Sequence, residues 1–105
     1  MALKKKITMS NGLPLEYHRI ALVNIQPNQE IVVLRHSYLD ESARQYEKDY
    51  ALGLINGEPT FPYVDYEYIT IPYSGNIDML IGGAMEGAYL LLKKHRPEFS
   101  DAEDV

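Results

Sequence analysis

Three short runs in the first 39 residues have the character of β-strands, and apolar and polar residues alternate over residues 15–25 in particular. We predict strands over residues 5–9, 15–25 and 30–39, the third rich in β-branched residues. Turn-forming residues separate them, Ser10-Asn11-Gly12 after the first strand and Pro27-Asn28 after the second. The sequence therefore predicts an antiparallel meander of three strands.

A short helix and a fourth strand are predicted next, over residues 41–52 and 63–73. Asp40 or Ser42 is expected to cap the helix, and Gly53 to end it. Two prolines and an Asn-Gly pair within residues 54–62 predict an irregular connection. Pro72 places the end of the fourth strand at a sheet edge.

The last third of the chain carries a helical pattern from residue 76 to residue 96. Asn76 is expected to cap this long helix and Pro97 to stop it. Each internal glycine at positions 82, 83 and 87 costs about 1 kcal/mol relative to alanine. We expect a close neighbour at these glycines, and a kink near Gly82-Gly83 is the alternative. The apolar positions at helical spacing are Ile77, Leu80, Ile81, Ala84, Ala88, Leu91 and Leu92.

These elements predict an α+β fold. We expect a small, mostly antiparallel sheet of about four strands, packed against a long C-terminal helix and one shorter helix. The apolar stripe of the long helix should pack on Ile20, Leu22, Val32 and Leu34. With 105 residues the chain is expected to form a single domain, residues 1–105, with a flexible acidic tail over residues 98–105.

Composition excludes several classes of protein. The net charge of −5 is unlike that of a general nucleic-acid binder, and without cysteine neither a disulfide framework nor a thiolate metal site is possible. The apolar runs are too short to span a membrane, and no apolar segment of a secretory signal follows the basic start. We therefore expect a cytoplasmic protein with no membrane or nucleic-acid partner.

The charges are concentrated at the two ends. A positive cluster near the start faces a negative one at the end, which serves solubility or, as an alternative, head-to-tail attraction between copies. If the acidic end mediates association, removing it should change the melting temperature little. The clusters are Lys4, Lys5 and Lys6, and Glu98, Asp101, Glu103 and Asp104.

No residue pattern indicates catalysis or a cofactor. His18 and His36 lie on neighbouring predicted strands, but a metal site needs a third ligand that no spacing supplies. Asp65 and Glu67 share a strand face and are expected to face solvent. We predict no catalytic residue, no metal, no cofactor and no enzymatic activity.

The chain has nine tyrosines and no tryptophan, and four of the tyrosines gather around the fourth strand. Such side chains pack across strands, form protein interfaces or stack on ligands. The candidate interface residues are Tyr63, Tyr66, Tyr68, Tyr73, Glu98, Phe99, Asp101, Glu103 and Asp104.

Both ends of the chain also resemble a known group of proteins. The start, KKKITMSNG at residues 4–12 and EYHRI at residues 16–20, and the end, EGAYLLLK at residues 86–93 with PEF and AEDV, resemble small proteins of prophages and tailed phages from low-GC Gram-positive bacteria. The resemblance implies a structural or tail-assembly role. We therefore expect a protein that acts in the host cytoplasm or the virion through contacts with other phage structural proteins, as a homo-oligomer. A small regulatory or ligand-binding module that uses the tyrosine-rich strand is the alternative.

Overall fold

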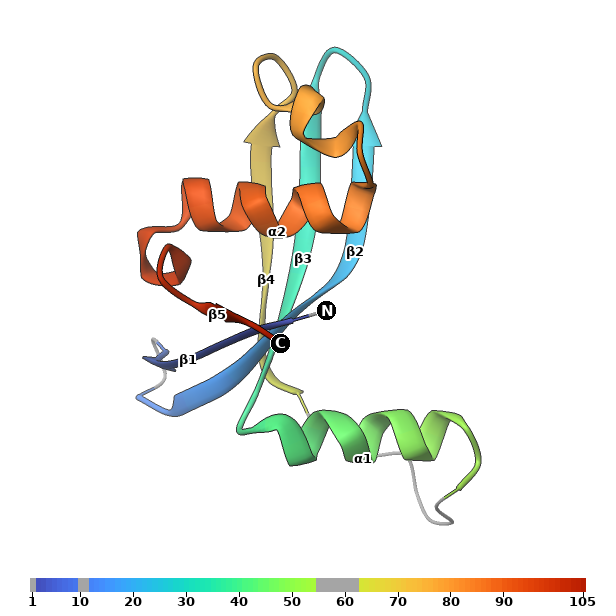
Figure 1. The fold of residues 1–105 in the computed structure, drawn as a ribbon, viewed down its shortest axis with the longest axis vertical. Helices are drawn as coiled ribbons and strands as arrows, with labels where there is room; N and C mark the ends of the chain where they lie inside the picture. Colours follow the sequence, from blue (N-terminus) through green and yellow to red (C-terminus); the bar gives the residue numbers. More distant parts are fainter. Residues whose placement is uncertain (1, 10–11, 55–62) are drawn as a thin grey trace.

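One antiparallel sheet with the strand order β4-β3-β2-β1-β5 forms the centre of the molecule (Figure 1). The computed structural model describes residues 2–9, 12–54 and 63–105. The three-strand meander is confirmed, and the sheet has a fifth strand where about four were expected. The strands are β1 (Leu3–Thr8), β2 (Pro14–Gln26), β3 (Glu30–Tyr38), β4 (Tyr63–Pro72) and β5 (Glu103–Asp104).

The predicted turns are found where the structure describes them. Asn28 adopts a φ of 63° in a turn closed by the Gln29 N–H, which donates to the Gln26 carbonyl at 3.0 Å. In the first turn, Gly12 has a φ of 85°. The other two residues of that predicted turn, and the predicted connection past Leu54, lie outside the described residues.

Helix α1 (Glu41–Ala51) matches its prediction closely, and the cap is Asp40. Its Oδ1 accepts a hydrogen bond of 3.0 Å from the Ala43 N–H. Gly53 ends the helix with a φ of 76°, a value that glycine adopts without strain. The helix lies at one end of the sheet (Figure 1), next to the buried Tyr38.

The predicted long C-terminal helix is two elements, η1 (Ile77–Leu80) and α2 (Ala84–His95). The break falls at Gly83, whose φ of 150° does not continue a helix. The kink alternative is therefore confirmed there, and Ile81, which should have joined the core, is 79% exposed. Close packing is found only at Gly87. Neither α1 nor α2, the α-helices of the described chain, is long and apolar enough to cross a bilayer.

Asn76 does not cap η1 with its side chain, as the sequence had suggested. Its Nδ2 donates to the Pro72 carbonyl at 2.8 Å, and its Oδ1 accepts from Lys94 Nζ at 3.2 Å. His95 Nε2 lies 3.1 Å from the same oxygen. The buried amide therefore ties the end of β4 to the end of α2.

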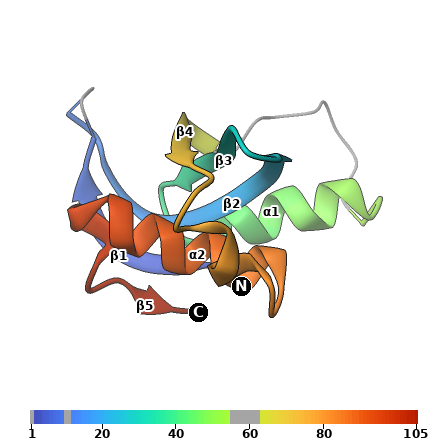
Figure 2. The ribbon, with the colours of Figure 1, turned by 90° about the horizontal axis from the view of Figure 1, so that it is seen from above.

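Helix α2 lies across one side of β2, β3 and β4 (Figure 2), and the core lies between them. Of the predicted sheet residues only Ile20 belongs to it. Leu22 is 47% exposed, because the β2–β3 register shifts between residues 20 and 22 and turns the next side chain to the opposite face. The core residues are Leu3, Ile20, Ile31, Val33, Ile69, Ile71, Leu80, Ala88, Tyr89, Leu91, Leu92, Phe99 and Ala102.

The face of β3 was also assigned wrongly. Residues 31–34 are all apolar, so alternation alone does not reveal which side the helix covers. In the structure the buried residues are Ile31 and Val33, whereas Val32 and Leu34 are half-buried.

The acidic end, expected to be a flexible tail, packs onto the sheet. After the turn η2 (Pro97–Phe99), strand β5 pairs with β1, and the Ala2 and Val105 backbones exchange two hydrogen bonds of 2.9 Å. Phe99 is 2% exposed. Its apolar ring explains the difference, because burying it outweighs the mobility expected of an acidic segment.

One pair of opposite charges from the two ends meets within the chain, because Lys5 forms an ion pair with Asp101. A second acid of the C-terminal cluster, Asp104, pairs with α2 instead: its Oδ1 lies 3.1 Å from Lys93 Nζ. At Lys5 and Asp101, the attraction that the sequence suggested between copies is therefore used inside one molecule.

Candidate functional site

The side of the sheet opposite α2 carries a cluster of aromatic rings. We call the surface formed by Leu34, His36, Tyr63, Tyr66 and Tyr68 the tyrosine face. These residues line a shallow hollow of about 290 Å³. Leu34 and His36 come from β3 and lie directly opposite Tyr68 and Tyr66 of β4, so cross-strand pairing brings the two sets together.

The rings of the tyrosine face contact one another in a row. His36 stacks on Tyr63 with ring centroids 4.0 Å apart and an interplanar angle of 20°. Tyr63 meets Tyr66 edge-on at 6.5 Å, and Tyr66 meets Tyr68 at 6.2 Å. Rings held in this way lose little conformational freedom when a partner covers them.

Tyr63 reaches this face through an irregularity that the sequence did not reveal. Strict alternation would place it with Asp65, on the side of α2. The β3–β4 register shifts between Ser37 and Tyr38, so that Ser37 pairs with Asp65 but Tyr38 pairs with Tyr63. The shift turns the Tyr63 ring to the side of Tyr66.

The centre of the tyrosine face is exposed and carries no acid. Tyr66 and Tyr68 are each 60% exposed. Alternation and register direct two sets of side chains to this face, and neither set contains an acid. On β4 they are Val64, Tyr66, Tyr68 and Thr70, and on β3 they are Val32, Leu34 and His36. Burial lowers the pKa of His36 below its ordinary value of 6.5, which favours the neutral ring.

The remaining predicted interface residues are scattered. Tyr73 packs against the core beyond the end of β4, and Phe99 lies inside the core, so neither joins the tyrosine face. The acids of the C-terminal segment lie around η2 and β5: Glu98, Asp101, Glu103 and Asp104.

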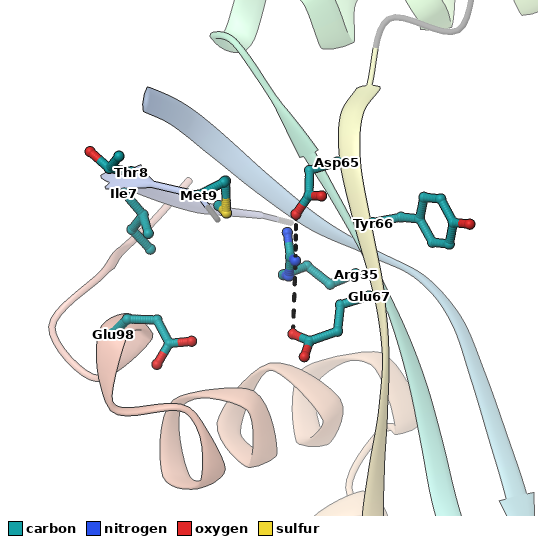
Figure 3. Close-up of a pocket in the computed structure, with 8 residues that line it drawn as sticks. All are labelled: Ile7, Thr8, Met9, Arg35, Asp65, Tyr66, Glu67 and Glu98. Carbon is teal, nitrogen blue, oxygen red and sulfur yellow. Dashed lines mark hydrogen bonds and ion pairs between the residues drawn. The ribbon is translucent and has the colours of Figure 1, made fainter. Parts of the chain in front are cut away.

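Asp65 and Glu67 were expected to face solvent, and their side chains remain only partly exposed, at 29% and 40%. They point to the side of the sheet that α2 covers and flank Arg35, whose side chain is 5% exposed (Figure 3). Arg35 Nη2 lies 2.9 Å from Asp65 Oδ2 and 3.8 Å from Glu67 Oε1. Which face a helix covers depends on tertiary packing, so the alternation of the strand did not reveal it. Figure 3 shows Tyr66 on the other side of β4.

Arg35 and its acids border a hollow of about 440 Å³ between β4, the end of β1 and η2. Glu98 enters it from η2 (Figure 3). Arg96 Nη2 binds Glu67 Oε2 at 3.0 Å. The arginines therefore pair with both strand acids, an arrangement that links α2 to the sheet. The other residues that line this hollow are Ile7, Thr8, Met9 and Tyr66.

A buried hydrogen-bond chain continues from Arg35 into the core. Arg35 Nη1 donates to Ser37 Oγ, which lies 2.7 Å from His18 Nδ1. His18 Nε2 lies 2.8 Å from the Lys5 carbonyl, and since a carbonyl only accepts, Nε2 carries the proton and Nδ1 accepts from the Ser37 hydroxyl. Ser37 and His18 are both 0% exposed, so a substrate does not reach the serine in this arrangement.

The two histidines that the sequence placed on neighbouring strands do not meet. His18 pairs with Ser37 in the sheet, so its side chain shares that face, and His36 points to the other one. Among the described residues, no group of three or more potential ligands could hold a metal ion.

Burial lowers the pKa of His18 below its ordinary value of 6.5. The unfolded chain then takes up a proton near pH 6.5 that the folded state resists, so the free energy of unfolding should fall as the pH drops from 7.5 to 5.5. Urea denaturation at several pH values measures this. The pKa of His36 is also lowered, so His36 adds to the same pH dependence, and an H36N variant should retain only the contribution of His18. If the H36N variant were equally stable at pH 7.5 and 5.5, the contribution assigned to His18 would be contradicted.

No model of a known protein family, no curated protein and no solved structure matches this chain.

Proposed function

We propose that this protein is a structural or assembly protein that acts by protein–protein contact through the tyrosine face. The observation that carries the proposal is that Tyr66 and Tyr68 remain 60% exposed on an acid-free sheet face. The centres of protein interfaces are enriched in tyrosine and depleted of charge. A partner that covers this face buries aromatic surface without desolvating a carboxylate.

The class of assembly follows from the resemblance of the two chain ends to small prophage and tailed-phage proteins. We assign the protein to the tail or baseplate region of a phage, in the host cytoplasm during assembly or in the virion. Its partners are then other phage structural proteins and further copies of itself. An acid-free face favours contact between copies in particular, because two molecules of net charge −5 repel one another elsewhere.

Strand β4 adds to this surface because it is the edge strand beside the tyrosine face. Among the described strands none pairs with its outer side, so a partner strand can pair with the outward backbone groups of residues 64–71. A partner that pairs with this edge also places alternate side chains on the tyrosine face.

A double variant, Y66S/Y68S, tests the proposal. Wild-type protein should form a discrete oligomer in light scattering at micromolar concentration, and the double variant should move toward the monomer. Both side chains are exposed, so each substitution should change the free energy of unfolding by only about 0.5 kcal/mol. Y46S on α1 is the matched control, and it should leave the mass unchanged. A strictly monomeric wild type, or equal masses for wild type and the double variant, would exclude self-association through this face.

The hollow of about 290 Å³ favours one alternative, a small ligand-binding module. A flat sugar or base could stack on the rings of His36 and the tyrosines. In that case wild-type protein should be a monomer, and titration with a planar ligand such as adenosine should quench tyrosine fluorescence in wild type but not in Y66S/Y68S.

A further inference from the structure

A third hollow, of about 270 Å³, lies where β2, α1 and α2 meet. The pairing of β1 with β2 ends at His18, and beyond it the Ile20 N–H donates to Tyr89 Oη at 2.9 Å instead of to a strand. The edge of β2 is therefore open at this point, with the two helices on either side. The lining residues are Tyr17, Arg19, Ile20, Arg44, Lys48, Met85 and Tyr89.

Three positive charges converge on this hollow. Arg19 comes from β2, and Arg44 and Lys48 lie one turn apart on the same side of α1. No carboxylate lines the hollow, although the chain as a whole carries a net charge of −5.

Glu47 of α1, which lies between Arg44 and Lys48 in the sequence, is already bound to its neighbours. Glu47 Oε1 accepts from Arg44 and from the Tyr38 hydroxyl at 2.8 Å, and lies 3.8 Å from Arg19 Nε. One carboxylate does not neutralise three cations, and Lys48 has no ion pair among the described residues. The contacts of Glu47 instead hold the two guanidinium groups in place.

The wall of the hollow is apolar. Tyr17, Ile20 and Tyr89 are buried, and Met85 stands at its rim. Low-dielectric walls strengthen the attraction that the cations exert on an anion.

We propose that this hollow binds a small organic anion, a carboxylate or phosphate attached to an apolar ring. The anionic group lies between Arg44, Lys48 and Arg19, and the ring covers Ile20 and Met85. No residue of the tyrosine face lines the hollow, so the site is independent of the function proposed above.

Titration with benzoate, phenyl phosphate and neutral benzyl alcohol, followed by NMR, tests the site. Both anions should shift the backbone signals of Ile20, Lys48 and Met85, with dissociation constants on the order of 1 mM, as expected for such small probes. Benzyl alcohol should bind at least about tenfold more weakly, since it lacks the charge. The tighter of the two anions identifies the natural group as a carboxylate or a phosphate.

Reversing one charge provides the matched pair of variants. Lys48 is exposed, so K48E should fold, and it should weaken binding of the preferred anion by about tenfold. K6E makes the same change at an exposed position on β1 and should leave binding unchanged. Shifts with neither anion, equal binding of the alcohol, or equal loss in the two variants would overturn the proposal.

Discussion

Replacing Phe99 with alanine should lower the free energy of unfolding by about 3–5 kcal/mol. The ring is 2% exposed, meets the His18 ring edge-on at 4.9 Å and lies 6.0 Å from the guanidinium carbon of Arg35. Its removal leaves a cavity beside two buried polar groups, which adds to the lost apolar burial. Urea denaturation monitored by circular dichroism measures the change.

Two controls separate the ring from the acidic segment around it. E98A changes an exposed neighbour in the same turn and should be nearly neutral, whereas F99L should recover much of the loss. Deleting residues 97–105 should be at least as damaging as F99A, contrary to the mild effect that the sequence suggested. A deletion variant that melts like the wild type would show that this segment is a detachable tail.

G87A should destabilise the protein by about 1–3 kcal/mol, although alanine is the better helix former. A Cβ at residue 87 would lie 2.1 Å from the Met79 carbonyl oxygen and 2.8 Å from Leu80 Cδ2. The carbonyl belongs to the backbone of η1, so relief of the clash requires η1 and α2 to move apart. The loss should appear as a lower midpoint in thermal and urea unfolding.

G82A is the matched control for this glycine. Nothing lies within 4 Å of a Cβ there, so the substitution should be neutral or stabilising by up to about 1 kcal/mol. Equal unfolding midpoints for G82A and G87A would show that η1 does not pack closely on α2.

Features with a local cause were predicted well from the sequence. The extents of β2 and β3, the turn at Asn28 and the Asp40 cap depend on residues that are neighbours in the chain. The break at Gly83 was only an alternative, because a glycine in a helical pattern fits both a kink and a close neighbour. Strand β5 was missed, since two residues carry no periodicity and their pairing partner, β1, lies at the other end of the sequence.

The tyrosine face was likewise predicted only in part from the sequence. Alternation placed Tyr66 and Tyr68 together on one face of a strand, and the structure agrees. Leu34 and His36 joined them only through the register of β3, and Tyr63 through a local irregularity. The sequence pattern of one strand reveals neither the register nor the irregularity, because both depend on how two strands pair.

The pairing of β1 with β5 has a consequence for the order of folding. The Lys5–Asp101 contact joins residues 96 positions apart, so forming it first would close a very long loop. Pairing of β2 with β3 and of β3 with β4, and the docking of α2, bring the two ends closer first, so the closing segment should dock last. Late intermediates would then expose the His18 imidazole and the free edge of β1, where hydrogen exchange should report the final step.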